Sequence, residues 1–320
     1  MNLMDKTIRN VFFRKPQLVP KNNSNNVFTR HYCLALLLIA LSSLLSCQQQ
    51  QQNGTQTNNA DTNTSNAANV KDAKTVVYQG AAGIVTMADL ANAKRVTDYS
   101  SIMPKYIPEE AKNNYQRAKD LLQQGNRQGY LQVMRQTAQQ MPDWPQPNYD
   151  LAFYYVLGAR LDSALHYYQI INNYYPEGYF DSKRAVFYLA NPDSLLRSAY
   201  IVYNQYKTFK RDTLKNATKE LEDLTKTVPQ FGPAWHDLIR RTPDHQQRQT
   251  IITQALNVVR DRESVAAILI ENAKTKAALG QNTEAIEILA GVLLNQQNTY
   301  LAREAAKYEL AVLVNSKKQE

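Results

Sequence analysis

The feature of this sequence that most restricts its fold is a pattern of paired helical segments that recurs at a spacing of 34 residues. Pro176 follows Pro142 by 34 residues, and Ala285 follows Ala217 by 68, which is twice that spacing. Self-similarity at a fixed spacing is typical of repeat proteins, in which each unit covers the apolar face of its neighbours. We therefore predict a stacked row of helix pairs rather than helices gathered around one centre.

The composition agrees with a helical protein. The chain has 320 residues, 43% of them hydrophobic and only 10 of them glycine, which allows a sizeable core and disfavours a many-stranded sheet. Pro142, Pro192 and Pro243 are each followed by Asp, a residue that starts helices. The pattern predicts about twelve helices, near residues 108–124, 128–141, 146–158, 162–174, 179–190, 194–208, 211–228, 232–241, 245–261, 264–279, 283–294 and 299–314.

The clearest repeat unit runs from Asn148 to Pro176 and has the sequence NYDLAFYYVLGARLDSALHYYQIINNYYP. It resembles the tetratricopeptide repeat, whose consensus positions it matches at Leu151, Ala152, Tyr155, Ala164, Tyr168 and Pro176. Trp235 stands six residues after Pro229, where the first-helix Trp of that family belongs. The resemblance implies an all-α, right-handed α-solenoid of helix pairs over residues 108–315.

Packing within such a row needs small residues where two helices approach closely and larger residues between pairs. The predicted small positions are Ala152, Ala164, Ala217, Ala273 and Ala285. The predicted space-filling positions are Tyr155, Tyr168, Leu221 and Leu289. Because Ala217 follows Ala164 by 53 residues, which is not a multiple of 34, we expect a longer helix or an additional one near residues 191–212.

In the tetratricopeptide family the first helix of each pair lines a concave groove that takes a segment of a partner protein. Carrying that register over gives nine candidate groove residues: Tyr115, Lys119, Tyr149, Phe153, Lys183, Phe187, His236, Arg240 and Lys274. Aromatic side chains beside cations suit an extended acidic or aromatic segment. The alternative is that Tyr149, Phe153 and Phe187 are ordinary core between repeats and that the cations form a solvated face.

The N-terminal part has the pattern of an export signal. Residues 33–46, CLALLLIALSSLLS, are uncharged and follow Arg30; this stretch is shorter than the roughly 20 residues that cross a bilayer. Leu44-Leu45-Ser46-Cys47 resembles the lipobox of bacterial lipoproteins. That resemblance implies a signal peptide at residues 1–46, cleavage before Cys47, and a covalent lipid on Cys47 as the only added group. A signal cut elsewhere and an uncleaved anchor are the alternatives.

Two segments separate the predicted signal from the helices. Residues 47–71 are Gln/Asn-rich and almost without large apolar side chains, which predicts a disordered tether spanning roughly 25–30 Å. A self-associating polar tract is the alternative. Residues 72–107 are ambiguous: residues 75–78 suit a short strand and residues 88–94 a helical turn or two, so we interpret the segment as a linker or N-terminal cap.

Charge and motifs argue against several classes of function. The net charge is +9, but residues 1–46 carry +5 of it, and subtraction leaves +4 for the rest of the chain. With no basic run that is interleaved with aromatics, we expect no nucleic-acid partner. Cys33 and Cys47 both precede the helices, and the four histidines form no HExxH pair, so we expect no metal site. No GxSxG motif occurs, and we expect no enzyme.

Together these features predict a membrane-anchored, non-catalytic tetratricopeptide scaffold of the bacterial cell envelope. It would bind a protein partner through the concave face of the solenoid and the membrane through its lipid. We expect an outer-membrane location, facing the periplasm or the cell exterior. A self-associating structural envelope lipoprotein is the first alternative, and an envelope hydrolase with a helical-repeat domain is the second.

Overall fold

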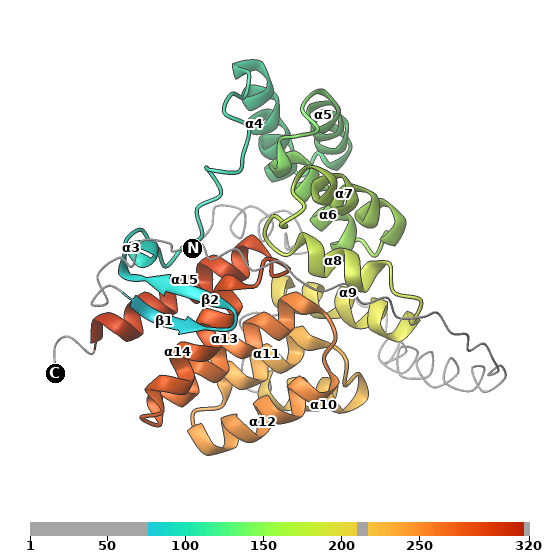
Figure 1. Ribbon diagram of the computed structural model, residues 1–320. Coiled ribbons are helices and arrows are strands. Elements are labelled where there is room, and N and C mark those ends of the chain that lie inside the picture. Colours follow the sequence, from blue (N-terminus) through green and yellow to red (C-terminus); the bar gives the residue numbers. More distant parts are fainter. Residues whose placement is uncertain (1–75, 210–216, 317–320) are drawn as a thin grey trace, which may run out of the picture. The chain divides into compact units, whose positions relative to one another are not determined.

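The computed structural model describes residues 76–209 and 217–316 (Figure 1). Within these residues the chain forms thirteen helices and one two-stranded antiparallel hairpin. The fold is therefore all-α apart from the hairpin, as the sequence pattern predicts. The right hand of the solenoid stays a prediction. The predicted signal peptide (1–46), Cys47 and the predicted tether (47–71) lie outside the described residues.

The helices that follow Pro108 match the twelve predicted from the sequence. They are α4 (Glu109–Gln123), α5 (Arg127–Gln140), α6 (Pro145–Leu157), α7 (Leu161–Tyr174), α8 (Ser182–Leu189), α9 (Ser194–Phe209), α10 (Ala217–Thr227), α11 (Gly232–Arg241), α12 (His245–Val258), α13 (Arg262–Ala278), α14 (Asn282–Leu294) and α15 (Tyr300–Ser316). The start predicted at residue 211 falls outside the described residues. Every other boundary agrees with the prediction within three residues.

Successive helices pack against one another in pairs, such as α4 with α5, α6 with α7 and α13 with α14. The positions predicted to be small are all buried: Ala152, Ala164, Ala217, Ala273 and Ala285. The predicted space-filling residues are buried as well: Tyr155, Tyr168, Leu221 and Leu289. Burying one large apolar side chain stabilises a fold by roughly 1.5–3 kcal/mol, so these positions account for much of the contact between helices.

The local signals for helix starts are confirmed at two of three positions. Asp244 caps α12 by accepting a 2.7 Å hydrogen bond from the backbone N–H three residues on. Asp193 accepts a 2.8 Å bond from the N–H two residues on, at the start of α9. Asp143 is not a cap, because Trp144 is the N-cap of α6 and Pro145 takes the first helical position. A proline there loses no hydrogen bond, since that N–H has no partner within the helix.

The irregular spacing between Ala164 and Ala217 corresponds to an additional helix. Ala164 lies on α7 and Ala217 on α10, so two helices, α8 and α9, stand between them where one repeat would place a single helix. This arrangement is one of the two that the spacing predicted.

The described chain begins with a hairpin of β1 (Val76–Gly80) and β2 (Gly83–Thr86), followed by the short helix α3 (Met87–Leu90). β1 contacts α14 and α3 contacts α15 (Figure 1). Val85 and Leu90 belong to the same buried cluster as side chains of α13, α14 and α15. The segment interpreted as a linker or N-terminal cap thus covers the C-terminal helices rather than α4.

Candidate functional site

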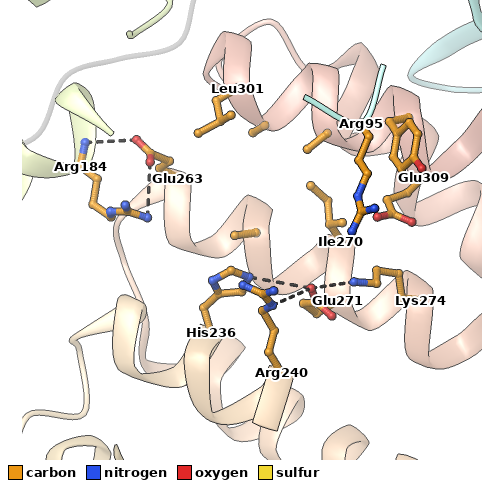
Figure 2. Close-up of a pocket in the computed structure, with 14 residues that line it drawn as sticks. Arg95, Arg184, His236, Arg240, Glu263, Ile270, Glu271, Lys274, Leu301 and Glu309 are labelled. Atoms are coloured by element: carbon orange, nitrogen blue, oxygen red, sulfur yellow. Dashed lines mark hydrogen bonds and ion pairs between the residues drawn. The ribbon is translucent and has the colours of Figure 1, made fainter. Parts of the chain in front are cut away.

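The candidate site is a pocket of about 440 Å³ between α8, α11, α13 and α15 (Figure 2). Its volume lies within the range of small-molecule pockets. It is lined by Arg95, Arg184, His236, Arg240, Glu263, Ala267, Ile270, Glu271, Lys274, Leu301, Ala302, Ala305, Tyr308 and Glu309. Most of these residues belong to first helices of successive pairs, which is the face that the repeat register assigns to partner binding.

Glu271 on α13 organises one side of the pocket. Its side chain is only 8% exposed and lies 2.9 Å from Nζ of Lys274 on the same helix. From α11, Nε of Arg240 and Nε2 of His236 each lie 3.9 Å from the same carboxylate. Burial lowers the pKa of His236 to about 4, so the imidazole is neutral at pH 7. One carboxylate therefore faces two permanent cations, and this side of the pocket carries an excess positive charge.

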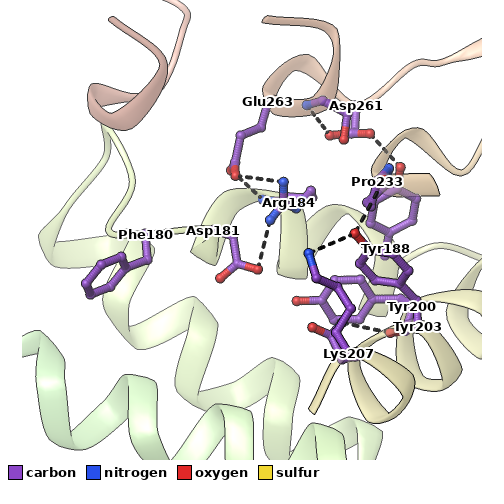
Figure 3. Close-up of polar contacts among 12 residues, drawn as sticks. Phe180, Asp181, Arg184, Tyr188, Tyr200, Tyr203, Lys207, Pro233, Asp261 and Glu263 are labelled. Atoms are coloured by element: carbon purple, nitrogen blue, oxygen red, sulfur yellow. Dashed lines mark hydrogen bonds and ion pairs between the residues drawn. The ribbon is translucent and has the colours of Figure 1, made fainter. Parts of the chain in front are cut away.

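Arg184 on α8 forms the second charged group (Figure 3). It lies between Asp181, at 3.1 Å, and Glu263 on α13, at 3.4 Å. The side chain of Glu263 is only 5% exposed, and burial raises its pKa to about 8. At pH 7 most of this carboxyl is protonated, which leaves Asp181 as the main counter-charge of Arg184.

A hydrogen-bonded lock next to this group fixes the relative positions of three helices. Asp261 accepts a 2.8 Å bond from the backbone N–H of Ser264 and so caps α13. Its other oxygen accepts a 2.5 Å bond from the hydroxyl of Tyr188 on α8. The same hydroxyl accepts a 2.9 Å bond from the N–H of Gly232, the first residue of α11. The charged side chains of the pocket therefore project from helices held in fixed register.

Arg95 reaches the pocket from outside the helical row, on the segment that follows α3 (Figure 2). Its guanidinium forms no ion pair in the part of the chain that the structure describes. Tyr308 and Glu309 on α15 line the wall beside it. A residue far from the repeats in sequence thus contributes one of the pocket's cations.

Residues 91–107, here called the crossing segment, connect α3 at the C-terminal helices to α4 at the other end of the row. Tyr99 is its buried anchor, with ring centroids 4.8 Å from Tyr179, 4.9 Å from Phe180 and 5.6 Å from Tyr300. The Tyr99 hydroxyl accepts a 3.1 Å bond from the N–H of Phe180. The hydroxyl of Tyr300 donates at 2.9 Å to the carbonyl of Asp98. The crossing segment is therefore fastened to both the α7–α8 loop and α15.

Three of the nine predicted groove residues, His236, Arg240 and Lys274, come together in the pocket. On α4, the Tyr115 hydroxyl donates to Asp150 at 2.8 Å and Lys119 lies 5.3 Å from the Tyr115 ring centroid. The other four residues lie on α6 and α8: Tyr149, Phe153, Lys183 and Phe187. The nine residues thus form no single site.

Tyr149 and Tyr115, the two tyrosines among the nine residues, take part in the packing between helices. The Tyr149 hydroxyl donates to Asp181 at 2.7 Å, and its ring packs edge-on against Tyr168 at 5.8 Å. The Tyr115 ring lies 5.0 Å from that of Trp144. Phe153 is partly buried, while Lys183 and Phe187 are exposed. Both tyrosines pack against the buried core of the helices, which for Tyr149 agrees with the alternative interpretation.

Five charged residues of the pocket are not indicated by the sequence patterns: Arg95, Arg184, Glu263, Glu271 and Glu309. Glu271 lies three residues before the predicted Lys274, on the same face of a helix, so the register itself could have indicated it. Arg184 and Glu263 are long-range partners, and no spacing in the sequence connects them. Arg95 becomes part of the site only because the crossing segment returns over the helices.

No group of three or more His, Cys, Asp or Glu side chains within residues 76–209 and 217–316 is arranged to hold a metal ion. None of the helices there is both long and apolar enough to cross a membrane.

Comparison with known proteins gives no relative: no family model matches the chain, and no match is found among the curated proteins or the solved structures.

Proposed function

We propose that this protein is a lipid-anchored, non-catalytic scaffold of the bacterial envelope that binds a partner protein through the face formed by α8, α11 and α13. One observation carries the proposal. The repeat register predicts His236, Arg240 and Lys274 as groove residues, and these three side chains lie together around Glu271. Charged side chains on adjacent first helices are suited to a partner of opposite charge.

The membrane part of the proposal is supported by the sequence. Residues 33–46 have the length of a signal-peptide apolar region, and Leu44-Leu45-Ser46-Cys47 resembles a lipobox. Two or more acyl chains on Cys47 would hold the protein stably, because each buried methylene contributes about 0.8 kcal/mol. The Gln/Asn-rich residues 47–71 would then separate the helical region from the bilayer.

Crosslinking and affinity capture from membranes test the protein-binding part. The wild-type chain is compared with Arg240→Glu/Lys274→Glu and with the control Lys219→Glu/Lys226→Glu, which changes two exposed cations of α10. We expect a protein recovered with the wild type and the control but lost with the pocket variant. Recovery of the same proteins by all three baits would contradict the proposal.

The lipid is tested separately. Mass spectrometry of the mature N-terminus should find Cys47 first in the chain, carrying a diacylglycerol thioether and an acylated amine. Cys47→Ser should leave the membrane fraction or keep its uncleaved signal. An unmodified Cys47 in a membrane-bound protein would reject lipid anchoring and leave the protein-binding part untouched.

A further inference from the structure

The pocket has a cationic end and an apolar wall. Arg240 and Lys274 stand at the cationic end, where their side chains are 60% and 40% exposed. Ile270 and Leu301 form part of the apolar wall, from α13 and α15 respectively (Figure 2). A cavity with both features suits a ligand that has a charged head and an apolar body.

The cations at this end retain free donors. The Arg240 guanidinium lies 3.9 Å from Glu271, which is too long for a hydrogen bond, and it has no other ion pair among the described residues. Lys274 contacts the same carboxylate at 2.9 Å, and an ammonium group has three donors. An acidic head could therefore bind between the two cations without displacing Glu271.

The balance of charges around the pocket also favours an anionic ligand. Four cationic side chains line the pocket: Arg95, Arg184, Arg240 and Lys274. Against them stand Glu271 and Glu309 in the lining, Asp181 beside Arg184, and the largely protonated Glu263. The lining is therefore net positive at pH 7.

We propose that this pocket binds a small organic anion, with its carboxylate, phosphate or sulfonate head between Arg240 and Lys274 and its apolar body against Ile270 and Leu301. A free small molecule is the proposed occupant because the volume of the pocket, about 440 Å³, is that of a small-molecule site. The proposal goes beyond protein binding and does not depend on it or on the lipid.

Calorimetric titration of the full-length protein in a mild detergent tests the proposal. The probe is 4-phenylbutyrate at pH 7 and low salt, with a matched titration into detergent alone. For a ligand of about a dozen non-hydrogen atoms we expect a Kd of roughly 1 mM or tighter. Its neutral isostere 4-phenylbutyramide should bind at least about fivefold more weakly, and this comparison needs no variant.

Substitutions of the two pocket cations test where phenylbutyrate binds. Arg240→Gln and Lys274→Gln should each weaken phenylbutyrate binding about fivefold or more, as expected for the loss of a charge-assisted hydrogen bond. Lys276→Gln is the matched control, since Lys276 lies on the same helix but pairs with Glu284 at 2.7 Å outside the pocket. Unchanged thermal unfolding of each variant shows that it is folded.

Three outcomes would overturn the proposal. They are no binding of phenylbutyrate by the wild type up to several millimolar, equal binding of acid and amide, and equal effects of Lys274→Gln and Lys276→Gln. A pentapeptide that ends in Phe with a free carboxylate is titrated into the protein in the same way. If this peptide bound more tightly than phenylbutyrate, the pocket would belong to the end of a protein chain instead of a small anion.

Discussion

The backbone N–H of Tyr300 donates a 2.8 Å hydrogen bond to the carbonyl oxygen of Glu177. This bond joins the first turn of α15 to the loop between α7 and α8. Arg303, also in that turn, pairs with the Glu177 carboxylate, and Gly178 has a φ of +86° that lets the loop turn at this point. The last helix therefore contacts an early part of the row and gives the pocket a wall.

We expect Tyr99 to hold the crossing segment against α15 and the α7–α8 loop. Tyr99→Ala removes a side chain that is 7% exposed and packed among three aromatic rings. We expect a loss of about 3 kcal/mol of unfolding free energy and faster amide hydrogen exchange in residues 91–107. Urea unfolding and exchange mass spectrometry measure these two effects.

Tyr106 provides the matched control on the same segment, because its side chain is 75% exposed. Tyr106→Ala should change the unfolding free energy by less than about 0.5 kcal/mol and leave exchange in residues 91–107 as in the wild type. Equal effects of the two substitutions would mean that the crossing segment is not anchored through Tyr99.

Gly232 should tolerate no side chain where α11 meets α13. A Cβ at this position would lie 2.3 Å from Cβ of Ser264 and 2.7 Å from Oδ2 of Asp261. Gly232→Ala must displace α11 or break the Asp261 lock, and we expect a loss of roughly 2 kcal/mol or more. In contrast, a Cβ on Gly291 within α14 meets nothing within 4 Å. Gly291→Ala should stabilise by about 0.5–1 kcal/mol, so thermal unfolding should shift in opposite directions.

The helices and their packing positions follow from the sequence because both depend on local pattern. A buried small residue such as Ala152 recurs at the helix-pair spacing, and all twelve predicted helices are present. Lys274 and Arg240 could be placed on the first-helix face for the same reason. Each of these statements needs only the helical period and the repeat length.

The rest of the site could not be predicted, because it depends on contacts between distant parts of the chain. Nothing in the sequence near Arg95 indicates that it lines a pocket with Arg184 and Lys274. The bond between Tyr300 and Glu177 likewise depends on how far the row curves, and small angles between successive pairs set that curvature.

Asp244 and Asp143 both follow a proline before a helix, but only Asp244 is a helix N-cap. Asp244 follows Pro243 and caps α12, so Asp244→Ala should cost about 1 kcal/mol. Asp143 follows Pro142 in the same way but is not the N-cap of α6, and Asp143→Ala should change stability by less than about 0.5 kcal/mol. Chemical unfolding of both variants measures the difference. A larger loss at Asp143 would restore the cap that the sequence pattern predicted.

Glu263 should make the protein less stable as the pH rises through neutrality. Burial raises its pKa to about 8 in the folded protein, against 4.5 for an ordinary Glu. Between these values the folded state holds a proton that the unfolded chain releases, so this stabilisation is complete below pH 4.5 and is lost as the pH rises through about 8. From pH 6.5 to 8.5 the loss should be about 1–2 kcal/mol.

Glu263→Gln isolates this effect, since the amide keeps the shape of the carboxyl and cannot ionise. His236 and Asp150, with pKa values of about 4 and 6, titrate mainly below the window from pH 6.5 to 8.5. Urea unfolding at the two ends of the window should therefore show a smaller decrease for Glu263→Gln than for the wild type. Glu284→Gln, at an exposed carboxylate on α14, is the matched control. If the wild type and Glu263→Gln lost equal stability, the carboxyl would be ionised beside Arg184 in the folded protein.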